Sequence, residues 1–189
     1  LLSARASYLA GFDGTSNMQA GMQWDIPLYG TMAHSYIEVH ELEVQAFRAY
    51  ADSLTGLRGP LMLLIDTYDT EAAARKIVAL APALERRGAR IASVRLDSGD
   101  LAAHARLVRT IFDQGGLQEI SIFASGSLDE WRLRQLLQAS APIDGFGVGT
   151  ALSTSADTPA LDAVYKLQSY AGKPRRKRSE GKATWPGAK

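Results

Sequence analysis

Four short runs of aliphatic and β-branched residues alternate with longer stretches in which apolar residues recur every three or four positions. The runs span residues 61–66, 89–97, 119–125 and 143–149. The amphipathic stretches span residues 70–88, 101–116 and 129–140, and the first carries Ala73, Ile77, Leu80 and Leu84 at helical spacing. Strands and helices alternating in units this short predict parallel strands joined by crossover helices. The fold is therefore either an open doubly wound sheet or part of a (β/α) barrel.

Further local signals lie at the helix ends and before residue 61. Gly88 is the expected C-cap of the first helix. Leu107 and Leu137 are expected on the apolar faces of the second and third helices. Upstream, "GTSN" is expected to open a helix, and "IPLYGTMAHS" predicts a strand that leads into a longer helix.

Every predicted strand ends in carboxylates, hydroxyls or glycines. The four groups lie at residues 66–69, 97–100, 125–129 and 147–150. Helix capping explains any one of them, because Ser and Asp are common N-caps. Four consecutive turns of this kind favour a ligand site, since the carboxyl ends of parallel strands lie together and the following helices present free N–H groups there.

The residue types at these ends suit a phosphorylated sugar. Small residues after the third and fourth strands let the backbone approach an oxyanion, which predicts a phosphate grip. Asp66, Asp97 and Asp100 suit sugar hydroxyls or a hard cation such as Mg²⁺. Arg95 lies two positions before Asp97, on the same face of its strand. There it either pairs with a buried carboxylate or holds an anionic group through two N–H bonds.

His34 is the candidate among the three histidines. It lies in the expected first turn of a helix, where free N–H groups favour negative charge. Gly30 and Thr31 precede it and Ser35 follows, a small-residue setting that suits a phosphate. A lone histidine in such a place is most often structural or solvated. His40 and His104 lack comparable surroundings, and we assign them no function.

Composition narrows the class of protein. Of 189 residues, 46% are hydrophobic and 22% charged, which differs from a disordered, collagen-like or membrane chain. There is no apolar run of about 18 residues and no sign of an export signal, so we expect a cytoplasmic protein without a membrane partner. The chain has no cysteine, which excludes disulfides, thiol catalysis and cysteine-bound zinc.

Basic residues concentrate in residues 173–182, which contain six Lys or Arg and one Glu. That segment carries +5, which leaves −4 for the rest of a chain of net charge +1. A nucleic-acid partner is disfavoured, because the run is single and has no interleaved aromatic residues. We interpret residues 161–189 as a basic exit segment after a partial barrel of residues 1–160. The chain lacks an initiator Met and stops at "GKATWPGAK", so we expect a piece of a longer protein.

Seven motifs in order along the chain carry a resemblance: "GTSN", "GTMAHS", "LIDTYDT", "VRLDSGDL", "SGSLDE", "GFGVGT" and "LDAVYKLQSYAGKPRRKRSEGKATWPG". They resemble the nicotinate phosphoribosyltransferase family over essentially the whole chain. The resemblance implies a glycosyltransferase or ligase of NAD biosynthesis. In that reaction nicotinate displaces pyrophosphate from phosphoribosyl pyrophosphate to give nicotinate mononucleotide, and ATP hydrolysis is coupled through a phosphohistidine.

The resemblance also implies a fold and a set of ligands. The fold is part of an irregular (β/α) barrel of the type II phosphoribosyltransferase kind, with parallel strands alternating with helices. Mg²⁺ accompanies phosphoribosyl pyrophosphate and ATP, with Asp66 or Asp97 as its possible ligand, and no permanently bound cofactor is expected. The full-length enzyme is expected to form a homodimer.

Residue by residue, the resemblance matches His34 to the phosphorylated histidine and places Arg95 and Ser16 near the pyridine ring. Asp66 and Asp97 match the sugar and pyrophosphate side, with Arg95 and Asp97 counted as catalytic. Further expected substrate contacts are Asn17, Thr31, Tyr68, Ser98, Gly99 and Asp100. The expected phosphate contacts are Ser125, Gly126, Ser127, Gly147, Gly149 and Thr150.

The chain also departs from the family pattern. It is much shorter than family members, and it lacks the arginine-rich "RRA"-type segment and the aromatic residue that stacks on the pyridine. We therefore expect little transferase activity from the isolated chain. Two alternatives stay open: a truncated, non-catalytic fragment, or a relative that uses nicotinamide or quinolinate. Ser16 argues against nicotinamide, because amide-using relatives carry an acidic residue at that position.

Overall fold

The computed structural model describes residues 1–54, 61–161 and 163–186. It divides the chain into two compact units, Leu1–Thr31 and Met32–Lys189. Each unit is described by itself. The predicted boundary at residue 160 falls within the second unit and stays a prediction.

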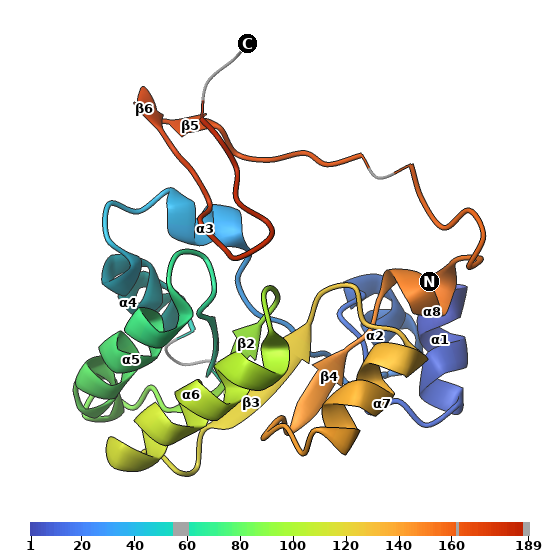
Figure 1. The fold of residues 1–189 in the computed structure, drawn as a ribbon, viewed down its shortest axis with the longest axis horizontal. Coiled ribbons are helices and arrows are strands. Elements are labelled where there is room, and N and C mark those ends of the chain that lie inside the picture. Colours follow the sequence, from blue (N-terminus) through green and yellow to red (C-terminus); the bar gives the residue numbers. More distant parts are fainter. Residues whose placement is uncertain (55–60, 162, 187–189) are drawn as a thin grey trace. The chain divides into compact units, whose positions relative to one another are not determined.

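The first unit contains α1 (Leu2–Leu9) and α2 (Met18–Trp24) (Figure 1). Asn17 caps α2 as the "GTSN" motif predicts, because its side chain accepts a hydrogen bond from the Ala20 N–H at 2.9 Å. The strand predicted over "IPLYGTMAHS" is wrong. That stretch makes only an isolated parallel bridge between Leu28 and Thr15. Pro27 has no N–H to donate, so this pairing does not extend into a ladder.

The second unit begins with α3 (His34–Glu38) and α4 (Glu43–Ser53). The single longer helix predicted after residue 34 is therefore wrong. His40 Nδ1 lies 2.8 Å from the Tyr36 carbonyl oxygen in the turn that ends α3. The Leu42 N–H donates to the Gln45 side chain at 3.1 Å, which satisfies a free donor and starts a new helix.

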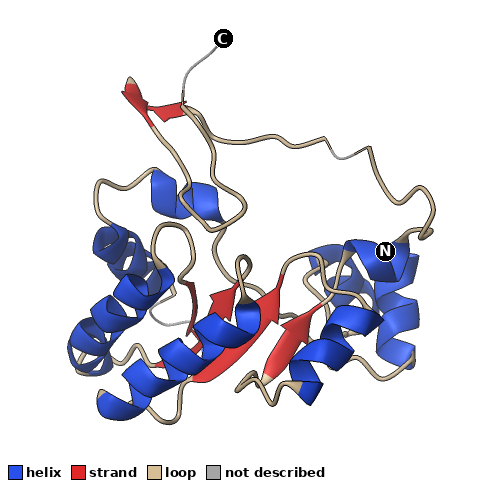
Figure 2. Ribbon diagram, viewed as in Figure 1, coloured by secondary structure: helices blue, strands red, loops and turns tan. Residues whose placement is uncertain are grey.

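Strands β1 (Leu61–Leu64), β2 (Ile91–Leu96), β3 (Ser121–Ser125) and β4 (Gly145–Gly147) form one parallel sheet in sequence order (Figure 2). This confirms the predicted parallel strands, each of which is shorter than predicted: β1 ends before its polar residues, β3 starts later than predicted, and β2 and β4 are shorter at both ends. One row across the sheet consists of Leu64, Arg95, Phe123 and Gly145. This register fixes which residues meet at the carboxyl edge.

Helices α5 (Thr70–Glu85), α6 (Leu101–Gln114), α7 (Glu130–Gln138) and α8 (Thr150–Ser153) follow the four strands in turn. Asp69, Asp100 and Asp129 cap the first three, each accepting N–H bonds from the first helical turn. Helix α5 ends with Arg86 as its C-cap. Gly88, predicted in that role, instead adopts φ +78° in the turn that follows.

The core lies between the sheet and its helices. Helices α5 and α6 pack against each other and against the strands (Figure 1), and bury side chains such as Ile77 and Phe112. The expected core positions of α5 are all buried. Leu107 and Leu137 depart from prediction, because they are 51% and 65% exposed at the borders of their helical faces.

The last two strands, β5 (Ser169–Tyr170) and β6 (Lys173–Pro174), form a hairpin. Ala171 and Gly172 make its two-residue turn with positive φ at both positions, the geometry that suits the twist of a tight hairpin. Residues 175–184, here named the return segment, then run back to the carboxyl ends of β1 and β2 (Figure 1, red). No described helix is both long and apolar enough to cross a membrane.

Two substitutions on α6, one at a buried and one at a half-exposed position, test this placement of the core. Phe112→Ala removes a fully buried ring. In the intact gene product that contains this chain, here called the complete polypeptide, it should lower the free energy of unfolding by about 3–5 kcal/mol. Leu107→Ala, half exposed on the same helix, should change it by no more than about 0.5 kcal/mol. Chemical denaturation followed by circular dichroism measures both. Equal effects of the two changes would contradict this placement of the core.

Candidate active site

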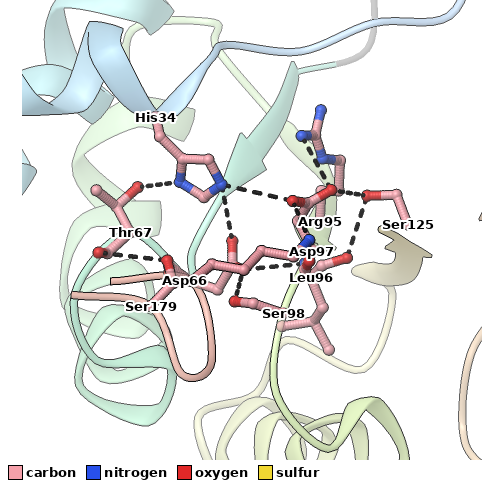
Figure 3. Close-up of polar contacts among 10 residues, drawn as sticks. His34, Asp66, Thr67, Arg95, Leu96, Asp97, Ser98, Ser125 and Ser179 are labelled. Carbon is pink, nitrogen blue, oxygen red and sulfur yellow. Dashed lines mark hydrogen bonds and ion pairs between the residues drawn. The ribbon is translucent and has the colours of Figure 1, made fainter. Parts of the chain in front are cut away.

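The candidate active site lies at the carboxyl edge of the sheet. Asp66, Asp97 and Ser125 each stand two residues beyond the row formed by Leu64, Arg95 and Phe123. Because side chains alternate along a strand, the parallel register places these three groups on one side of neighbouring chain segments. Figure 3 shows them converging with His34.

Asp66 is the most deeply buried member, with 2% of its surface exposed. Its Oδ2 accepts hydrogen bonds from the Asp97 N–H at 3.1 Å and from the Ser98 hydroxyl. Its Oδ1 has no hydrogen-bond partner among the described residues. A buried carboxylate oxygen left unpaired is costly, so this atom marks a place for a donor or a cation.

His34 begins α3 and points at the two carboxylates (Figure 3). Its Nδ1 lies 3.0 Å from the Thr67 hydroxyl. Its Nε2 lies 3.9 Å from Asp66 Oδ1 and 3.7 Å from Asp97 Oδ2, and makes no hydrogen bond among the described residues. One ligand atom from each of His34, Asp66 and Asp97 lies within 4.8 Å of the other two.

Asp97 is held by groups on both sides. Its Oδ1 accepts from the Ser125 hydroxyl at 2.8 Å and lies 3.6 Å from Arg95 Nη2. Its Oδ2 lies 3.0 Å from Lys182 Nζ. Burial raises the pKa of Asp97, but the neighbouring His34, Ser125 and Lys182 outweigh burial and hold that pKa well below its usual range. Asp97 is therefore ionised at neutral pH.

The return segment contacts the site through its hydrogen bonds to residues 66, 67 and 97. Ser179 donates its hydroxyl to the Asp66 carbonyl, and the Arg178 N–H donates to the Thr67 carbonyl at 2.8 Å. Lys182 donates to the main-chain carbonyl of Asp97 as well as to its carboxylate. Lys177 is 2% exposed, and burial lowers its pKa although Asp66 and Asp97 oppose that shift. Two cations from the basic segment thus face the two carboxylates.

Comparisons with known proteins show which family the chain belongs to. The model of the nicotinate phosphoribosyltransferase (NAPRTase) family matches residues 3–173. The chain belongs to the nicotinate phosphoribosyltransferase family. Nicotinate phosphoribosyltransferase pncB2 of Mycobacterium tuberculosis strain H37Rv is 49% identical over 186 residues, which cover 98% of this chain and 39% of that protein. The chain therefore spans about two fifths of this curated relative.

Solved structures of the family share the fold. Human nicotinic acid phosphoribosyltransferase matches with a TM-score of 0.67 at 27% identity, over 91% of this chain and 42% of that one. Nicotinate phosphoribosyltransferase from Vibrio cholerae matches with a TM-score of 0.76 at 20% identity, over 97% of this chain and 47% of that one. The predicted α/β fold of the type II phosphoribosyltransferase kind is confirmed, with this chain as a part of it.

Three predicted residues beside the carboxylates have structural contacts. Asp100 caps α6, accepting from the Ala102 and Ala103 N–H groups at 3.1 Å each, as the capping interpretation expects. Tyr68 is partly buried against the core, and burial raises its pKa, with Glu38 and Glu43 adding to the rise. Gly99 takes φ +72° in the turn before α6. Substrate contact by these residues stays a prediction.

The residues predicted to bind phosphate differ in how closely they are packed: Gly126 is tightly packed, whereas Gly149 is not. Gly126 has φ +92° and a Cβ added there would lie 2.3 Å from the Asp97 carbonyl oxygen, so only glycine fits this approach. Ser127 also adopts positive φ, at 51°. Gly147 ends β4, and Gly149 precedes Thr150, the first residue of the four-residue α8. A Cβ added at Gly149 would meet no atom of the described residues within 4 Å.

Three predicted substrate contacts belong to the first unit. Asn17 uses its side chain to cap α2, Ser16 is exposed beside it, and Thr31 is the last residue of the unit. The first unit is described on its own, so the predicted place of Ser16 beside the pyridine ring stays a prediction.

The sequence interpretation missed the groups that close the site. It counts Thr67 only within the strand-end group 66–69 and assigns no individual role to Lys177, Ser179 or Lys182. His104, to which it assigns no function, contacts two carboxylates. The opposite charges of residues 173–182 and of the rest of the chain were a usable signal. Charge alone does not say which acidic residues the segment meets.

The close packing at Gly126 can be tested by comparing it with Gly116, a second glycine of positive φ. Gly126→Ala should destabilise the complete polypeptide by at least about 1 kcal/mol more than Gly116→Ala, because overpacking adds to the cost of positive φ. Both glycines have positive φ, +92° and +74°, but an added Cβ meets nothing within 4 Å at Gly116 and lies 2.7 Å from Lys182 Nζ at Gly126. Urea unfolding compares them, and equal losses would show that the approach of Gly126 to Asp97 is not needed.

Proposed function

We propose that this chain forms part of the active site of a nicotinate phosphoribosyltransferase. The reaction joins the pyridine nitrogen of nicotinate to the ribose C1 of phosphoribosyl pyrophosphate and releases pyrophosphate. The observation that carries the proposal is the pair of carboxylates, Asp66 and Asp97, set beside His34 and two lysines at the carboxyl edge of a sheet with this family's sequence. The relatives named above support the choice of substrate.

The proposed chemistry needs little acid or base catalysis. The pyridine nitrogen is already unprotonated as a nucleophile, and pyrophosphate leaves as an anion. The carbon–oxygen bond at ribose C1 breaks as the carbon–nitrogen bond forms, with positive charge building on the sugar. Catalysis then comes from positioning and electrostatics, which ionised Asp97 and its neighbour Asp66 supply for the sugar.

The cations of the site suit the negative charge of pyrophosphate and of the nicotinate carboxylate. Arg95, Lys177 and Lys182 surround the carboxylates, and Arg95 Nε has no hydrogen-bond partner among the described residues. Guanidinium and ammonium groups stabilise a departing pyrophosphate or hold the nicotinate carboxylate. Both roles for Arg95 in the sequence-based prediction are compatible with its long 3.6 Å contact to Asp97.

Mg²⁺ fits the same residues. Asp66 Oδ1 is buried and unpartnered, and an oxygen of Asp97 lies within 4.8 Å of it. Mg²⁺ prefers carboxylate and phosphate oxygens with several waters, and these two carboxylates are the groups that would hold it. When bound with phosphoribosyl pyrophosphate or ATP, it neutralises phosphate charge. Nicotinate, both phosphate substrates and a homodimer remain part of this proposal.

His34 is proposed as the phosphate acceptor that couples ATP hydrolysis. A ring nitrogen attacks the γ-phosphorus of ATP, the bond to the bridging oxygen breaks, ADP leaves, and water later cleaves the phosphohistidine. The hydrogen bond between Nδ1 and Thr67 fixes the ring, and Nε2 lies near both carboxylates. These contacts support an oriented ring rather than a solvated histidine.

An assay on the complete polypeptide tests the proposed function. Incubation with nicotinate, phosphoribosyl pyrophosphate and Mg²⁺ should give nicotinate mononucleotide, with nicotinamide and quinolinate giving far less product. Preference for either other pyridine would replace the proposed substrate. No product from any of the three would favour the non-catalytic alternative.

The role of His34 gives a separable prediction. His34→Ala should abolish ATP hydrolysis and labelling by γ-labelled ATP, but leave a slow ATP-independent transfer, because other loops build the sugar-phosphate site. Product formation with and without ATP measures both effects. His40→Ala is the matched control, since His40 contacts the Tyr36 carbonyl at the end of the same helix. Acid-labile label that persists in His34→Ala would assign the phosphate to another residue.

A further inference from the structure

His104 lies outside the proposed chemistry but joins three elements of the second unit. From α6, its Nδ1 lies 2.7 Å from Glu71 Oε1 on α5, and its Nε2 lies 3.1 Å from Glu180 Oε2 on the return segment. A neutral imidazole donates from one nitrogen only, and would turn a lone pair toward the second carboxylate. The arrangement therefore fits a charged ring that donates to both glutamates.

This contact holds the part of the return segment that reaches the site. Glu180 stands directly after Ser179, which donates to the Asp66 carbonyl, and two residues before Lys182, which pairs with Asp97. Ser179 and Lys177 are buried in the same segment, whereas Glu180 is largely exposed. The pairing with His104 thus fixes the exposed side of a segment whose buried side contacts the main chain of Asp66 and the carboxylate of Asp97.

The turn "DSGD" has a glycine where the His104–Glu180 pair lies close to the main chain. A Cβ added at Gly99 would lie 2.7 Å from His104 Nε2 and 2.9 Å from Glu180 Oε2. Gly99 also has φ +72°, which a side chain disfavours. Gly99, in the turn between β2 and the helix that carries His104, thus lies directly against the ion pair.

We propose that His104 is a positioning residue that clamps the return segment to α5 and α6 and so holds Lys182 against Asp97. Its effect on the site passes through Glu180 and the segment, without contact with substrate. The kinetic part of this inference rests on the proposed function, whereas the clamp itself does not.

The clamp has a defined dependence on pH. Among the described residues, the charged groups that contact the His104 ring are Glu71 from α5 and Glu180 from the return segment. Asp100, the N-cap of α6, accepts the His104 main-chain N–H through its carbonyl. Burial lowers the pKa of His104, but the two glutamates outweigh burial and raise it. A raised pKa means that the clamp is complete below about pH 6.5, the ordinary value for histidine, and is lost as pH rises through the folded-state pKa.

Hydrogen exchange of the complete polypeptide tests the clamp without any activity. The reporting amides are Arg178, Lys182 and Thr184, which donate to carbonyls in or beside the segment. At pH 6, His104→Gln should lower their protection factors about tenfold, as the loss of a charge-assisted hydrogen bond predicts. Glu180→Gln should lower them about threefold, because its pair is exposed. Glu85→Gln, an exposed glutamate of α5, should leave them unchanged.

The rescue variant is His104→Lys, which keeps a cation between the glutamates up to about pH 10. Its protection factors should stay flat with pH, whereas those of the wild type should fall as His104 loses its proton. A purely packing role for the ring predicts loss in His104→Lys and no pH dependence in the wild type. That result, or unchanged protection in His104→Gln, overturns the clamp.

Binding of inorganic pyrophosphate, followed by calorimetry, connects the clamp to the site. His104→Gln should weaken pyrophosphate binding about tenfold at pH 6, matching the loss of protection, because Lys182 is no longer held. With transferase activity present, KM for phosphoribosyl pyrophosphate should rise more than kcat falls. Lower protection with unchanged pyrophosphate binding overturns the positioning role. A wild type that binds pyrophosphate but makes no product overturns the proposed function and leaves the clamp standing.

Discussion

The structure depends on how two neighbouring carboxylates, Asp66 and Asp97, are accommodated at the end of a parallel sheet. The register of β1 and β2 brings them together, and burial makes their charges costly unless donors and cations meet them. Main-chain and hydroxyl donors satisfy one oxygen of Asp66, while Ser125 and Lys182 satisfy Asp97. The remaining acceptor, Asp66 Oδ1, faces His34. The same requirement therefore shapes both the fold of this edge and its chemistry.

The sheet alone does not meet that requirement. Its own cation, Arg95, contacts Asp97 only at 3.6 Å, and the closer contact comes from Lys182, which lies 85 positions after Asp97 in the chain. The return segment brings this lysine together with Ser179 and the buried Lys177. Opposite charges on the two parts of the chain favour their meeting, but hydrogen bonds to the carbonyls of Asp66 and Thr67 fix the register.

Sequence reasoning succeeded where the physics is local or repeats along the chain. The alternation of strands and helices, their parallel pairing and the meeting of Asp66, Asp97 and Ser125 follow from apolar periodicity and from the alternation of side chains along strands. It failed at residues 26–42, where a proline and a side-chain cap overrode the pattern, and at Leu107 and Leu137, which lie at the borders of their helical faces. Capping explained Asp100, as one of the two interpretations of the strand ends expected.

The contacts that sequence reasoning missed share one property, which is that their partners are far apart in the chain. His104 resembles an ordinary surface histidine in its own helix, and only tertiary packing brings Glu71 and Glu180, 33 and 76 positions away, to its two nitrogens. The cost of ordering a loop rises slowly with its length, so a distant segment that supplies several charged and hydrogen-bonding groups is a feasible partner. A site of two carboxylates can therefore draw its cations from a segment whose sequence reads as a solvated basic run. Because Asp97 at the end of β2 pairs with Lys182 of that segment, the carboxylate that is proposed to stabilise the sugar cation also holds the return segment at the carboxyl edge of the sheet.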